Sequence, residues 1–89
     1  MSAAKHTPGP WKAFSTWVDG ADGSTVAETG LPTTPTRLAA ANAELIAAAP
    51  DLLAALRGML DVQSSRDPFK EREAERAALA AIAKAEGRS

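Results

Sequence analysis

The chain has no cysteine, no tyrosine and a single histidine among its 89 residues. Without cysteine there are no disulfide bonds and no thiolate metal sites, which fits a reducing compartment. A catalytic site needs a nucleophile, a base and a group that orients the base. His6 lies in a proline-rich N-terminal segment, where we expect a solvated side chain, and the serines have no base near them in sequence. We therefore predict a protein that is not an enzyme and has no cofactor or metal.

The chain also lacks an excess of charge of either sign, since ten basic and eleven acidic residues leave a net charge of -1. No global positive field is present to attract nucleic acid or anionic lipid. The longest apolar run is too short to span a bilayer, and the N-terminus has no apolar segment of the signal-peptide kind. We expect a soluble cytoplasmic protein that does not contact membranes.

Large hydrophobic side chains are scarce. The hydrophobic fraction is 45%, but much of it is alanine, and only two tryptophans and two phenylalanines supply bulk. The length allows one domain at most, so we predict a flexible tail over residues 1–10 and a single small domain over 11–89. A small core rich in alanine is marginally stable alone. Such domains gain stability by self-association or by docking on a partner, and we expect a homo-oligomer.

The N-terminal half has the composition of strands. Aromatic and β-branched residues over about 10–29 favour a half-buried sheet, and Asp22-Gly23 is typical of a hairpin turn. We expect residues 17–19 to pair with 24–28, with a third strand from residues 11–14. The sequence thus predicts a small antiparallel meander, which needs helices packed on it to be stable.

The stretch 37–60 has the clearest helical period. Its apolar residues recur at steps of three and four: Leu38, Ala41, Leu45, Ala48, Leu52, Leu56 and Met59. Thr34 and Pro35 are typical of a helix start, which gives a helix over about 35–48. Pro50 either kinks this helix or begins a second one, over about 50–62; we favour the break. We expect the stretch to cover the sheet.

A third helix is predicted over about 68–86. Asp67-Pro68 repeats the cap-then-proline pattern after a loop at 63–68, and Gly87 is a suitable C-terminal stop. The second half of this helix presents a narrow face of alanines, which suits close contact between helices within or between chains. The predicted fold is α+β, with self-association through alanine-rich helical faces.

Four residues are candidates for ligand or partner binding. Trp11 and Trp17 could stack on a ligand or partner, or simply close the sheet onto the first helix, which we favour. Arg37 could pair with a phosphate. Asn42 lies inside the apolar stripe, where a polar residue sets register or oligomeric state, or bonds a neighbouring loop.

Two segments together resemble a known group of proteins. Residues 6–11 spell HTPGPW, and residues 41–56 spell ANAELIAAAPDLLAAL. The chain is similar to a widespread group of short phage and prophage proteins that open with HTPGPW and have ANA-x-LIAAAP-[DE]-LL-x-AL as their helical centre. The resemblance implies a phage-encoded protein in the bacterial host cytoplasm. Its expected function is non-enzymatic binding that inhibits or modulates a host protein, such as a component of antiviral defence.

Three alternatives stay open. The first is an oligomeric sponge that sequesters a nucleotide signalling molecule between subunits. The second is a small nucleic-acid-binding regulator, which we disfavour because Lys70, Arg72 and Arg76 are interleaved with glutamates. The third is a structural role in the phage particle.

Overall fold

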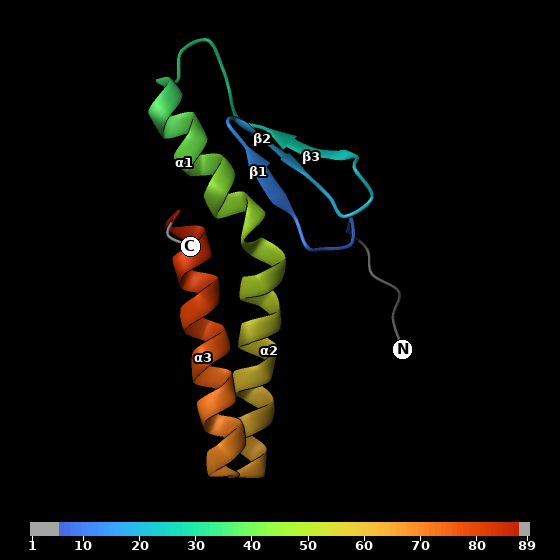
Figure 1. The fold of residues 1–89 in the computed structure, drawn as a ribbon, viewed down its shortest axis with the longest axis vertical. Helices are drawn as coiled ribbons and strands as arrows, with labels where there is room; N and C mark the ends of the chain where they lie inside the picture. Colours follow the sequence, from blue (N-terminus) through green and yellow to red (C-terminus); the bar gives the residue numbers. More distant parts are fainter. Residues whose placement is uncertain (1–5, 88–89) are drawn as a thin grey trace.

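The computed structural model describes residues 6–87 and has the predicted α+β architecture. A three-stranded antiparallel sheet is followed by three helices (Figure 1). The strands are β1 (Lys12–Phe14), β2 (Trp17–Asp19) and β3 (Thr25–Glu28). The helices are α1 (Thr36–Ala47), α2 (Ala49–Ser65) and α3 (Pro68–Ala85).

The sheet has the order β1-β2-β3, and its pairing confirms the predicted meander. Val18 in the central strand pairs with Ala13 on one side and Ala27 on the other. The β2–β3 turn contains the predicted Asp22-Gly23, with Gly23 at a φ of 88° that side chains rarely adopt. The Asp22-Gly23 turn thus determines the pairing of β2 with β3, and this pairing determines which residues face α1.

The first two helices are separate, as the favoured interpretation of Pro50 predicted. Ala48 lies between them with φ -82° and ψ -6°, and Pro50 occupies the first turn of α2. Proline is tolerated there because the first backbone N–H groups of a helix have no partner within it. The predicted Thr34 cap was wrong, since Pro35 is the N-cap and no side chain accepts a capping hydrogen bond at this end.

The loop after α2 is shorter than predicted. α2 continues to Ser65 instead of ending near residue 62, and Arg66 stops it in the left-handed conformation, at a φ of 59°. α3 starts as predicted, with the Asp67 side chain accepting a hydrogen bond from the Phe69 backbone N–H (2.9 Å). The end of α2 and the start of α3 are therefore both set by local interactions. The connection between the two helices spans only two residues.

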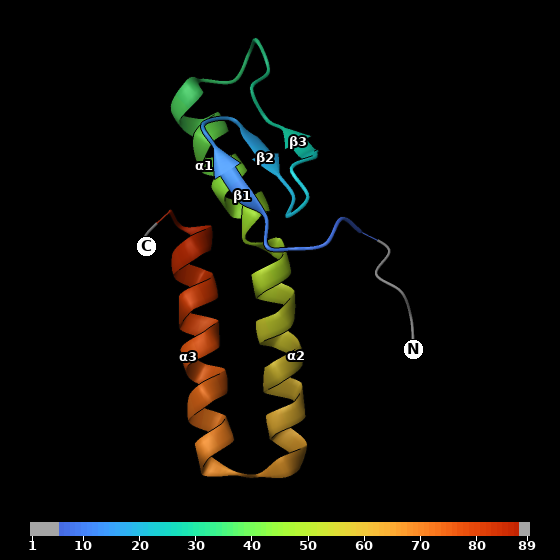
Figure 2. The same ribbon diagram turned by 45° about the vertical axis from the view of Figure 1, so that its right-hand side comes forward.

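The helices and the sheet form an elongated molecule. α2 and α3 run antiparallel as a hairpin. α1 precedes α2 and is joined to it at a bend, and the sheet lies against α1 (Figures 1 and 2). The expectation that the stretch 37–60 covers the sheet is correct for α1 and wrong for α2. The bend next to Pro50 directs α2 away from the sheet, and α2 packs on α3 instead.

The core lies between α1 and the sheet. Val18, Ala43 and Ala47 are fully buried there, with Trp11 and Ile46 packed against them. The buried face of α1 is thus the alanine face, whereas Leu38 and Leu45 of the same helix are exposed. Alanine lets the helix backbone approach the sheet closely, and the Trp11 ring fills the remaining space.

The alanine face of α3 is also used within the chain. Ala74 and Ala81 are buried, and α3 makes its main contacts with α2. Of the two predicted uses of this face, contact within the chain is thus confirmed for Ala74 and Ala81, and contact between chains stays a prediction.

The segment before β1 is held against the rest of the chain from residue 6 onward. Pro8 O accepts a hydrogen bond from the Ala21 backbone N–H (3.3 Å), and Gly9 abuts the Pro50 ring. The predicted tail over 1–10 lies partly outside the described residues, and the domain boundary at residue 11 stays a prediction.

Candidate functional site

Trp11 belongs to the core. It lies directly before β1, is partly buried, and packs on the cluster formed by Val18, Ala43 and Ala47. Its indole N–H donates to the carbonyl oxygen of Thr7 (2.9 Å), so the polar atom of the ring is satisfied inside the chain. The interpretation of Trp11 as the residue that closes the sheet onto the first helix accounts for these contacts.

Trp17 is on the opposite face of the sheet. Successive side chains of a strand alternate between faces, so Trp17 points away from α1 while its neighbour Val18 points toward it. Phe14 is its cross-strand partner, and the two rings stack at 6.1 Å between centroids and 24° between planes. The side chains of Trp17 and Phe14 are 39% and 43% exposed. We call this pair the aromatic pair.

Charged residues surround the aromatic pair. Lys12 shares its face through strand alternation with Phe14, Asp19 follows Trp17 by two residues, and Glu28 pairs directly with Trp17 across the sheet. The outer face of the sheet therefore has an aromatic centre and a rim of one basic and two acidic side chains.

Arg37 and Asn42 are both exposed on α1. Arg37 is in the first turn of that helix, and Asn42 is one residue before the buried Ala43. The structure does not bring the four predicted residues into one site. Trp11 is in the core, Trp17 is on the outer sheet face, and Arg37 and Asn42 are on the helix.

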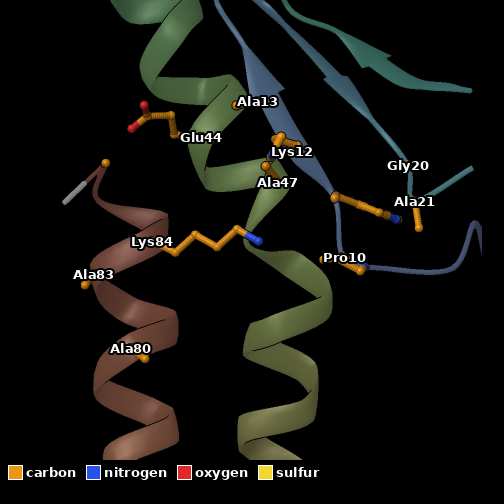
Figure 3. A pocket seen from close by; sticks show the side chains of 12 residues that line it. Pro10, Lys12, Ala13, Gly20, Ala21, Glu44, Ala47, Ala80, Ala83 and Lys84 are labelled. Atoms are coloured by element: carbon orange, nitrogen blue, oxygen red, sulfur yellow. The ribbon is translucent and has the colours of Figure 1, made fainter. Parts of the chain in front are cut away.

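A pocket of about 890 Å³ opens where β1, the end of α1 and the end of α3 meet (Figure 3). Its lining is mostly small and apolar: Pro10, Trp11, Lys12, Ala13, Gly20, Ala21, Glu44, Ala47, Ala80, Ala83, Lys84 and Gly87. Of the four predicted residues only Trp11 lines it. Sequence reasoning missed the rest because alanines at a helix end carry no chemical signal of a pocket.

Lys84 links the two ends of the helical hairpin. Its side chain extends from α3 toward the junction of α1 and α2 (Figure 3), where its Nζ donates to Oδ2 of Asp51 at 2.6 Å. Asp51 lies in the first turn of α2 and Lys84 in the last turn of α3, so each charge also suits the dipole of its own helix. Both side chains are more than a third exposed, and solvent screening keeps such a pair weak.

The leucine stripe is exposed. Six large side chains of α1 and α2 face solvent in the described chain: Leu38, Leu45, Leu53, Leu56, Met59 and Leu60. We call these six the leucine face. Large exposed apolar patches are a common feature of contact surfaces in proteins. Sequence reasoning found the period but assigned it to the interior.

Among the residues that the structure describes, no three His, Cys, Asp or Glu side chains gather to hold a metal ion.

One carboxyl group, that of Asp22, has a shifted pKa. The Ser24 hydroxyl and backbone N–H both donate to Asp22 Oδ1, at 2.7 and 3.0 Å, and hold the pKa of Asp22 below its ordinary value. This side chain shapes the β2–β3 turn, so its shift is structural. Within the described part, no helix is long and apolar enough to cross a membrane.

Comparison with protein families supplies the setting. The family model of Salmonella phage P22 protein Y8K6 matches residues 1–89. The chain belongs to this phage protein family. This membership confirms that the chain belongs with phage proteins, as the resemblance implied. No curated protein and no solved structure matches the chain.

Proposed function

We propose that this phage protein is a non-catalytic binding protein that inhibits or modulates a host protein in the bacterial cytoplasm, for which a component of antiviral defence is a candidate. The observation that carries the proposal is the aromatic pair of Phe14 and Trp17, stacked and exposed on a sheet face that α1 does not cover. Aromatic residues are enriched among the side chains that dominate binding energy at protein interfaces.

The surroundings of the pair favour a protein partner. Interfaces between proteins have an apolar core and a polar rim, which is the arrangement of Phe14 and Trp17 within Lys12, Asp19 and Glu28. The rim is more acidic than basic, so the complementary surface is an apolar recess flanked by basic side chains. The same acidic rim disfavours a nucleic-acid backbone. On α3, Lys70, Arg72 and Arg76 remain interleaved with exposed glutamates, so the nucleic-acid alternative gains nothing.

The test compares two single variants in quantitative capture from host lysate. Trp17→Ser removes half of the aromatic pair, whereas Leu31→Ser removes a more exposed apolar side chain from the linker before α1. We expect a specific host protein to be retained by the wild type and by Leu31→Ser. Trp17→Ser should weaken its binding by at least about 30-fold, as for a central interface residue. Equal retention by both variants would show that the sheet face is not the binding surface.

The nucleotide-sponge alternative has one observation in its favour, which is the pocket beside Trp11. Lys84, whose amine donates to Asp51, is among the residues that line a volume of about 890 Å³, a size that suits an anionic small molecule. Under this alternative, cyclic or ADP-ribose nucleotides should raise the melting temperature of the wild type. Lys84→Gln should reduce that shift. No shift with either class of nucleotide would exclude them as ligands.

A further inference from the structure

We propose that the leucine face is the contact surface with a second copy of this chain, so that the protein is a homodimer held by α1 and α2. The stripe has a heptad pattern. Leucine or methionine recurs every seventh residue at Leu38, Leu45, Leu52 and Met59, and a second row of the same period is formed by Asn42, Ala49 and Leu56. Rows that alternate at steps of four and three form the contact surface of paired helices. We call these seven residues the seam.

The seam is continuous and available. Ala48, between the two helices, stays in the right-handed helical region, so the face continues across the bend. All seven seam residues are exposed in the single chain except Leu52, which is partly exposed. The exposure of Leu45 is 54% and that of Leu56 is 61%. The seam therefore makes little contact inside its own chain.

α3 extends this surface at the side of the seam. Met59, the last seam residue, lines a pocket of about 430 Å³ together with Glu71 and Glu75 of α3. Leu79 and Ile82 follow Glu75 by four and seven residues, which places them on the same side of α3. Both are exposed, so the apolar surface spans the helical hairpin.

The area is close to what a dimer needs. Eight large side chains contribute, with exposed fractions that add to about four complete side chains: Leu38, Leu45, Leu53, Leu56, Met59, Leu60, Leu79 and Ile82. A complete aliphatic side chain carries on the order of 100 Å² of apolar surface, so two copies remove about 800 Å² from water through these residues. The exposed Asn42 and Ala49 and the partly exposed Leu52 add to this area and bring it toward the roughly 1,000 Å² of a specific interface.

The composition of the seam favours a second copy over another partner. None of its seven positions is charged, so an identical surface meets it without repulsion. Its one polar residue, Asn42, sits where a buried amide sets the register and number of paired helices. The chain also has a reason to dimerise, because Val18 is the largest side chain that it buries fully among the described residues.

Sedimentation velocity of the full chain over a concentration series tests the proposal. We expect a dimer, and a dissociation constant at least 100-fold higher in Leu45→Glu and in Leu56→Glu. Leu31→Glu, in the linker before α1, is the control and should dimerise like the wild type. Far-ultraviolet circular dichroism of each variant verifies the helical content. A wild type that is monomeric at every concentration, or a dimer unaffected by both substitutions, would overturn the proposal.

A second experiment does not depend on tolerance of a charge. Ala49 is at the middle of the seam, where a two-fold axis places it opposite its own copy in a parallel pairing and in a centred antiparallel one. The chain has no cysteine, so Ala49→Cys is its only thiol. Mild oxidation should convert most of this variant to a covalent dimer and leave Leu31→Cys monomeric under the same conditions. Equal cross-linking of the two variants would contradict the proposed surface.

Discussion

At the scale of single residues, the two segments of the phage motif pair meet at Gly9 and Pro50. A Cβ added at Gly9 would lie 2.9 Å from Pro50 Cβ and 3.3 Å from its Cγ. The proline ring is rigid and cannot turn aside, so Gly9→Ala must displace the N-terminal segment from the start of α2. We expect a loss of about 1–2 kcal/mol in the free energy of unfolding, measured by urea denaturation, as for an overpacked contact. An unchanged unfolding midpoint would show that the segment is not held there.

Gly58 gives the opposite prediction and serves as a matched control. It lies inside α2, and an added Cβ would meet no described atom within 4 Å outside its own helix. Alanine at this position restricts the unfolded chain without a clash. Gly58→Ala should therefore raise the free energy of unfolding by about 0.5–1 kcal/mol in the same urea assay. A destabilised variant would mean that another chain approaches the helix closely at this point.

Single residues also show where sequence reasoning stops. Trp11 and Trp17 both lie in the stretch with the composition of strands. From the sequence, either side chain could lie on the sheet face that packs on a helix. Only the register decides between them, because Trp17 pairs with Phe14 on the face that Val18 does not share. A shift of one residue would exchange the faces, and composition does not specify that shift.

At the scale of elements, the stability of the β2–β3 turn depends on pH through the ionisation of one carboxyl group. Asp22 accepts hydrogen bonds from Ser24, so its pKa in the folded state is lower than the ordinary 3.8. A lowered folded pKa contributes stability that is present above the unfolded pKa and is lost as pH falls through the folded one. We expect Ser24→Ala to raise the pKa of Asp22 toward 3.8 in a titration followed by nuclear magnetic resonance. An unchanged pKa would show that the Ser24 hydroxyl does not lower the pKa of Asp22, since the backbone N–H of residue 24 remains in the variant.

The element boundaries were predictable where a residue with special backbone chemistry marks them. Gly23 marks the hairpin, Pro50 the start of α2, and Asp67 with Pro68 the start of α3. The end of α2 was not predicted because Arg66 ends the helix in a left-handed conformation, which an arginine in the sequence does not indicate. A prediction of element ends therefore depends on glycine, proline and cap residues being present at them.

The direction in which the central helices face was not predictable from their period. A stripe of leucines normally packs on the core, but here the alanines at 39, 43 and 47 are buried and the leucines are left outside. Both faces of α1 are apolar, so the hydrophobic pattern alone does not choose between them. The choice depends on the close fit of the sheet and Trp11 against small side chains, which is a property of the assembled fold.

At the scale of the whole molecule, the small intramolecular core and the exposed leucine face lead to one prediction about stability. If the folded chain is a dimer, unfolding separates two copies, so its melting temperature depends on protein concentration. Each tenfold rise in concentration should raise the melting temperature by about 3–5 °C for a chain of this size. Differential scanning calorimetry over two decades of concentration measures this dependence.

The comparison with Leu56→Glu assigns the dependence to the leucine face. Its side chain is 61% exposed in the single chain, so the charge disturbs little within the subunit. The variant should melt at a lower temperature that no longer changes with concentration, because unfolding becomes unimolecular. A wild type whose melting temperature is also constant would show that the buried alanines, Val18 and Trp11 stabilise the chain without a partner copy. The leucine face would then be left for another partner, and the host-capture experiment would have to include variants of both faces.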